Sequence, residues 1–142
     1  MNPNYWLVLS SCSFIAPAIT CYYSKNYLLT YTYCLLTLIS SLYHATKNPS
    51  LIFIDYSINH IVHILTLWNI LKGREYSMPY YCICLSYIFT IYYYGYITKT
   101  LVWDYNLDTA TPWHMSLHIS TSATTSYTVW ATFKYQQKLH GL

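Results

Sequence analysis

The sequence predicts an all-α protein: an integral membrane helical bundle of about five transmembrane helices. Of its 142 residues, 55% are hydrophobic and only 8% are charged, against roughly 25% charged in a typical soluble domain. A soluble fold of this length could not cover its surface with so few charges. Nineteen tyrosines hold the mean hydropathy at +0.25, although the tyrosine ring is apolar and its hydroxyl favours the bilayer interface.

Five stretches approach the length of about 20 mostly apolar residues that a helix needs to cross the hydrocarbon core. They cover residues 5–23, 27–45, 50–71, 79–97 and 112–133. We expect them to form a single transmembrane domain over residues 1–142, because no stretch remains for a separate soluble module.

Prolines and polar segments set the boundaries of these helices. Pro17 predicts a kink in the first helix, and Pro49 predicts a break after the second. The polar residues 72–75 close the third helix, and residues 99–111 read as the longest loop. Pro112 then suits the first turn of the last helix.

The distribution of charge predicts the orientation in the membrane. One side would carry Lys25, Lys72, Arg74, Lys134 and Lys138, and the other Lys47 and Lys99 beside Asp104 and Asp108. The positive-inside rule then places the N-terminus outside or in a lumen and the C-terminus in the cytoplasm. Because the basic residues are scattered among short loops, we expect no nucleic-acid partner.

Ionisable groups within membrane spans are costly and therefore mark candidate functional residues. Ser40 and His44 are four residues apart and share one face of the second helix. Asp55 is the only acidic residue inside any expected span. His114 and His118 are also four residues apart, a spacing with which one helix can present two imidazoles to one metal ion.

Connectivity places these residues at a similar depth. The second helix ends on the outer side of the membrane, and the third and fifth helices begin there. Three neutral imidazoles with one open position are the ligand set of a catalytic zinc ion, which activates a bound water as a nucleophile. A carboxylate could accept the proton of that water, and a serine hydroxyl could orient the water or polarise a carbonyl.

A plainer interpretation stays open for each residue. The late histidine pair could hydrogen-bond to neighbouring helices, and Asp55 could be a protonated or paired acid in the bundle. The Ser40 hydroxyl could bond to the carbonyl four residues earlier. His60 and His63 would lie deeper than Asp55, so we expect packing or polar contacts between helices from both.

The order Ser-x3-His, Asp and late His-x3-His resembles the signature of the CREST superfamily of membrane proteins. This superfamily includes alkaline ceramidases, adiponectin and progestin receptors, hemolysin III-like proteins and GPI-lipid remodelling proteins. Residues 40–44, Ser-Ser-Leu-Tyr-His, are similar to the S-x-x-Y-H form of several branches, and residues 54–57 are similar to the start of their third helix.

The resemblance implies that His44, His114 and His118 bind Zn2+ and that Asp55 and Ser40 surround the zinc-bound water. It also implies a zinc-dependent, ceramidase-like hydrolase of an amide or ester bond in a membrane lipid. Asp55 would deprotonate the water, and Ser40 would help to hold the oxyanion. The sequence departs from the family in having five expected spans instead of seven, so a second copy or a partner subunit could complete the bundle.

Two other functions remain open from the sequence. The chain could be a non-catalytic membrane receptor or structural subunit that retains the metal site, which the shortened bundle favours. It could also be a haem-binding electron-transfer subunit, with His44 and His118 as axial ligands. Haem ligation would assign no role to Asp55 and Ser40.

Overall fold

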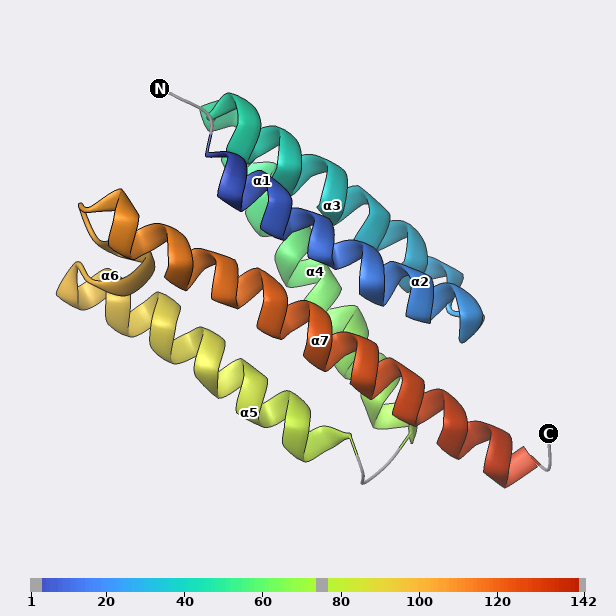
Figure 1. The fold of residues 1–142 in the computed structure, drawn as a ribbon. Helices are drawn as coiled ribbons and strands as arrows, with labels where there is room; N and C mark the ends of the chain where they lie inside the picture. The colour runs from blue at the N-terminus through green and yellow to red at the C-terminus, as the bar shows by residue number, and fades with distance from the viewer. Residues whose placement is uncertain (1–3, 74–76, 141–142) are drawn as a thin grey trace.

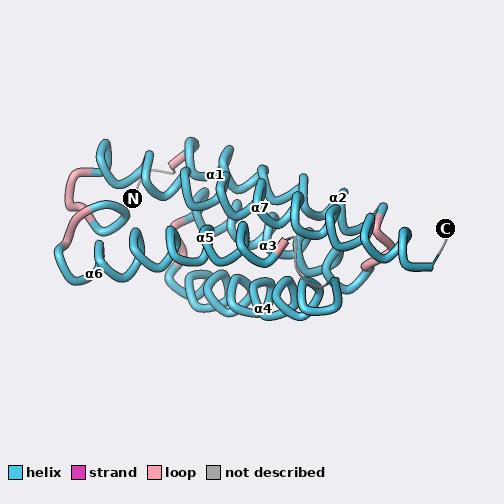
Figure 2. The backbone as a smooth tube through the Cα atoms, turned by 90° about the horizontal axis from the view of Figure 1, so that it is seen from below, coloured by secondary structure: helices cyan, strands magenta, loops and turns pink. Residues whose placement is uncertain are grey.

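The computed structural model describes residues 4–73 and 77–140, which are almost entirely helical, with no strand in either range (Figure 1, Figure 2). The elements are α1 (Tyr5–Ser11), a 3-10 turn (Cys12–Phe14), α2 (Ile15–Tyr23), α3 (Tyr27–Thr46), α4 (Pro49–Gly73), α5 (Met78–Phe89), a π-helix (Thr90–Tyr94), α6 (Gly95–Thr98), a second 3-10 turn (Leu101–Trp103) and α7 (Leu107–His140). The all-α class predicted from the sequence is therefore confirmed.

The first expected helix forms as two α-helices joined by the 3-10 turn at Cys12–Phe14. Pro17 explains this position, because its ring has no N–H and crowds the carbonyl four residues earlier, at Ser13. The disturbance expected from Pro17 thus lies one turn before the proline.

The last helix begins earlier than expected, so the connection predicted over residues 99–111 ends at residue 106. α7 begins at Leu107, where the Asn106 side chain accepts a hydrogen bond of 2.9 Å from the Asp108 amide. Asp108 also favours this start, since a negative charge in the first turn complements the helix dipole. Pro112 lies inside the helix, where it removes only the backbone bond to the Asp108 carbonyl.

Gly95 allows the chain to reverse after the π-helix. A Cβ atom at this position would lie 2.7 Å from the carbonyl oxygen of Thr100, which is closer than real Cβ contacts. Lys99 adopts a left-handed conformation with φ of 57°, and the second 3-10 turn then folds back against Gly95.

α7 lies at the centre of the bundle and packs against α1, α2, α4 and α5, while α3 packs against α1, α2 and α4 (Figure 1). The ends of the described chain lie at opposite ends of the bundle, as an odd number of long helical passes requires. The end of α3 and the starts of α1, α4 and α7 therefore gather at one end.

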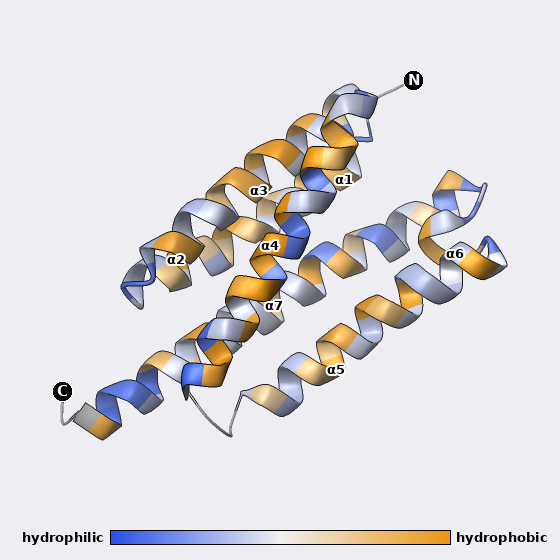
Figure 3. Cartoon of the chain, turned by 180° about the vertical axis from the view of Figure 1, so that it is seen from behind, coloured by the Kyte–Doolittle hydropathy of each residue, from blue (hydrophilic) through white to orange (hydrophobic). Residues whose placement is uncertain are grey.

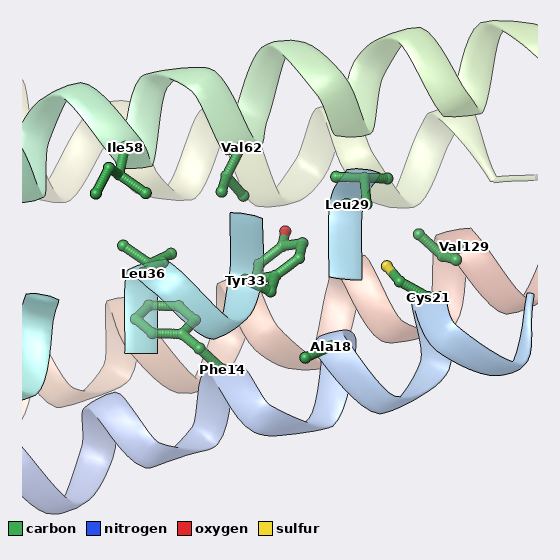
Figure 4. Packing of buried hydrophobic residues seen from close by; sticks show 9 residues of the cluster. All are labelled: Phe14, Ala18, Cys21, Leu29, Tyr33, Leu36, Ile58, Val62 and Val129. Carbon is green, nitrogen blue, oxygen red and sulfur yellow. The ribbon is translucent and has the colours of Figure 1, made fainter. Parts of the chain in front are cut away.

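A hydrophobic cluster joins α2, α3, α4 and α7 below this end (Figure 4). Its buried members include Phe14 before α2, Leu36 on α3 and Val62 on α4. Tyr33 lies among them, and its hydroxyl donates a hydrogen bond of 2.9 Å to Thr125 of α7. This packing fixes α3 relative to α7.

Two helices of the described chain, Tyr5–Tyr23 and Pro49–Lys72, are long and apolar enough to cross a membrane. The other three expected spans do not meet the same criterion. Serine, threonine and tyrosine are frequent in α3 and α7, which lowers the hydropathy of helices that are otherwise long enough.

Candidate metal centre

Three histidines from two helices converge at the end of the bundle where α3 ends. His44 comes from the last turn of α3, and His114 and His118 come from successive turns of α7. The ring centroids are 4.9 Å apart for His44 and His114, 5.5 Å for His44 and His118, and 4.8 Å for the pair on α7. One nitrogen from each ring lies within 4.8 Å of the other two.

His44 has an unusual environment for a histidine that serves only in packing. Its side chain is 1% exposed, and neither ring nitrogen has a hydrogen-bond partner among the described residues. A buried polar group without a partner costs about 1–3 kcal/mol. Coordination of a metal ion would satisfy one of these nitrogens, so the residues present fit such an ion.

The separation of the nitrogens also suits a small, tetrahedral ion. Zinc–nitrogen bonds of about 2.0–2.1 Å in tetrahedral geometry place the ligand nitrogens about 3.3 Å apart. Modest side-chain rotations would bring three nitrogens from within 4.8 Å to that separation. These three histidines could therefore hold a metal ion.

Ser10 of α1 determines which nitrogen of His118 is free. The Ser10 hydroxyl donates a hydrogen bond to the Leu7 carbonyl at 3.1 Å, and its oxygen lies 2.9 Å from Nδ1 of His118. With the serine hydrogen on the Leu7 carbonyl, a neutral His118 ring would donate from Nδ1 to Ser10. Nε2 would then be the unprotonated nitrogen and could bind a metal ion.

Ser40 is completely buried and lies beside the Asp55 carboxyl group. Its Oγ is also 3.1 Å from Oγ of Ser11 on α1. Oδ1 of Asp55 is buried and has no hydrogen-bond partner among the described residues. Ser40 is thus placed to orient the carboxyl group of Asp55.

A cavity of about 970 Å³ opens beside the histidines, between α4, α5 and α7. Its wall includes Asp55, His114 and His118, whereas His44 and Ser40 are not part of it. Aromatic and aliphatic side chains of α5 and the following π-helix form much of the remaining wall. α4 and α5 each pack against α7, and the cavity lies in the space between them.

The expected role of Ser40 as an oxyanion stabiliser stays a prediction. A group that stabilises developing charge must face the reacting carbonyl, and Ser40 is not part of the cavity wall. The structure places it against Asp55 instead.

Ser10 is the residue near the histidines that sequence reasoning missed. The connectivity used for His44 and Asp55 would have placed the start of the first helix at the same end of the bundle. A pair of serines in that apolar segment was therefore the available signal.

His63 forms the expected polar contact between helices, since its Nδ1 lies 3.2 Å from the Tyr81 hydroxyl. His60 bonds within its own helix, since its Nδ1 lies 2.7 Å from the carbonyl oxygen of Tyr56. It lines the same cavity as Asp55 and His63.

The crowding of the three rings disfavours axial haem ligation by His44 and His118. The His114 ring centroid lies 4.9 Å from that of His44 and 4.8 Å from that of His118, so it occupies space that a porphyrin between them would need.

No protein-family model, curated protein or solved structure matches this chain.

Proposed function

We propose that the chain is a five-span membrane bundle with the histidine end on the outer or lumenal side. Only 22% of the apolar segment in α4 is buried inside the protein, and large side chains such as Phe53 and Ile83 are 75% and 68% exposed. Hydrophobic residues recur along α3, α4 and α5 (Figure 3). A lipid bilayer would shield this apolar surface from water, whereas a monomer in solution would leave it exposed.

Within this bundle, we propose that His44, His114 and His118 bind Zn2+ and that the protein hydrolyses an amide or ester bond in a membrane lipid. The observation that carries the proposal is the buried His44 ring, which has no hydrogen-bond partner within the described part of the chain and lies beside two further imidazoles. A bound zinc ion would polarise a carbonyl and make a water molecule acidic near neutral pH.

Asp55 is the group in the cavity wall that is suited to move a proton. Its side chain lines the cavity, where the carboxylate would accept a proton from the attacking water. The same carboxyl group can then donate this proton to the leaving amine or alcohol. Ser40, which lies beside the carboxyl group, is a positioning residue in this scheme.

The cavity supports a lipid as substrate. Its volume of about 970 Å³ is at the upper end of the range typical for small-molecule sites, and apolar side chains of α5 provide a wall for an acyl chain. Asp55 and the two histidines of α7 all line this cavity, so a carbonyl near them would be continuous with a chain in the cavity.

The test is a paired measurement of zinc content and lipid hydrolysis on purified protein. We expect hydrolysis of an amide-linked or an ester-linked fluorescent lipid by the wild type. Asp55→Asn should lose this hydrolysis by at least about a hundredfold while it retains zinc. Asp104→Asn, in the segment before α7, is the matched control and should retain both properties.

Full zinc content with no hydrolysis of either lipid would instead favour the non-catalytic receptor or structural subunit. Absence of zinc from well-folded protein would contradict both functions.

A further inference from the structure

The α4 side of the cavity carries polar residues that the proposed hydrolysis does not use. Asn59, His60 and His63 line the cavity beyond Asp55. Asn59 and His63 follow Asp55 at positions i+4 and i+8 and share its face of the helix, and His60 lines the same cavity. Residues this close to the middle of α4 would lie deep in the bilayer, where polar groups are costly unless they have a function.

The hydrogen bonds of the two histidines determine their tautomers. Nδ1 of His60 lies 2.7 Å from the backbone carbonyl of Tyr56, which can only accept, so Nδ1 carries the proton. The Tyr81 hydroxyl donates to the backbone carbonyl of His63 at 2.9 Å, so its oxygen accepts from Nδ1 of His63 at 3.2 Å. In both neutral rings, Nε2 is left as an acceptor.

Asn59 adds a third acceptor to this row. Its Nδ2 donates to the backbone carbonyl of Asp55 at 3.0 Å, which leaves the amide oxygen to accept from a ligand. Three residues that line the cavity therefore each retain one acceptor atom. A complementary ligand must supply hydrogen-bond donors.

We propose that Asn59, His60 and His63 form a binding site for a hydroxyl group carried on the chain of a lipid in the cavity. A neutral hydroxyl fits better than an ammonium group, since none of the three residues supplies a negative charge. With a rise of 1.5 Å per residue, the site lies about 6–12 Å from Asp55 along the helix axis. The identification of this lipid as the substrate rests on the proposed function, whereas the acceptor site does not require the metal.

The test compares two ligands that differ only in the hydroxyl group. Purified full-length protein would be titrated with stearic acid and with a mid-chain hydroxystearic acid, each in competition with a fluorescent fatty acid. We expect the hydroxy acid to bind about three- to tenfold more tightly, as one additional hydrogen bond gives. Equal affinities in the wild type would overturn the proposal.

Variants assign the preference to the named residues. His60→Leu/His63→Leu should bind both acids equally, and His60→Leu alone, at an exposed position that tolerates change, should reduce the preference without disturbing Tyr81. Leu85→Ala, in the apolar wall, should weaken both acids to the same extent and leave the preference intact. A preference that persists in both histidine variants would contradict the site.

A metal-site variant separates this proposal from the hydrolase. His114→Ala/His118→Ala should lose zinc and still prefer the hydroxy acid. If wild-type protein lacks zinc but shows the preference, the acceptor site stands and the hydrolase fails. If zinc is present and the preference is absent, the acceptor site fails alone.

Discussion

Oγ of Ser10 lies 2.9 Å from Nδ1 of His118, so α1 contacts the histidine cluster through a hydrogen bond to one of its rings. Groups in this position set the tautomer and orientation of a metal-binding histidine and often matter nearly as much as the ligand itself. The N-terminal helix is thereby part of the candidate metal centre as well as of the bundle.

We expect Ser10→Ala to reduce the affinity for zinc by about ten- to a hundredfold, because Nδ1 of His118 loses its acceptor. Competition with a chromophoric zinc chelator would measure this affinity. Ser10→Thr retains the hydroxyl and should preserve most of it. Thr20→Ala, which removes a hydroxyl bonded only within its own helix, should have no effect. An unchanged affinity in Ser10→Ala would show that Ser10 does not act through His118.

His44→Leu tests the energetic consequence of the unbonded imidazole. In zinc-free protein, we expect its free energy of unfolding to be unchanged or raised by up to about 1–3 kcal/mol, since a buried group without a partner is removed. Zinc should no longer stabilise this variant. Unfolding in detergent with and without zinc measures both effects.

His63→Leu is the matched control for His44→Leu. Its ring is bonded to Tyr81, so we expect a loss of about 0.5–1.5 kcal/mol whether or not zinc is present. The interpretation of His44 would fail if His44→Leu destabilised the zinc-free protein as much as this control does.

Gly95→Ala tests the reversal of the chain between α6 and α7. The added Cβ would lie 2.7 Å from a backbone oxygen of Thr100, so we expect a loss of about 1–3 kcal/mol. Ile97→Ala at an exposed position nearby should change the free energy of unfolding by less than about 0.5 kcal/mol. Thermal unfolding would measure the free energy of unfolding of both variants. Equal values for the two would contradict the close contact at Gly95.

The sequence predicted the helices well where apolar stretches end in abrupt polar or proline breaks. α3 and α4 agree with the expected ranges to within two residues. The start of α7 was harder to predict, because Pro112 suggests a first turn whereas Asn106 provides the cap actually used. One lost backbone bond at the proline is evidently tolerated.

The convergence of the histidines was predictable because helix direction alone fixes which ends meet. The details within the cluster were not, since they depend on rotation of each helix about its axis. That rotation places Ser40 behind Asp55 instead of in the cavity and brings Ser10 to His118. His60 is on the wall of the same cavity.

The most direct test of the candidate metal centre is the metal content of detergent-purified protein beside His114→Ala/His118→Ala. We expect about one zinc per chain in the wild type, the stoichiometry of a three-histidine site with one open position, and loss of zinc in the variant. Well-folded wild-type protein without zinc, or equal zinc content in the two proteins, would contradict the proposal that these histidines form the metal site.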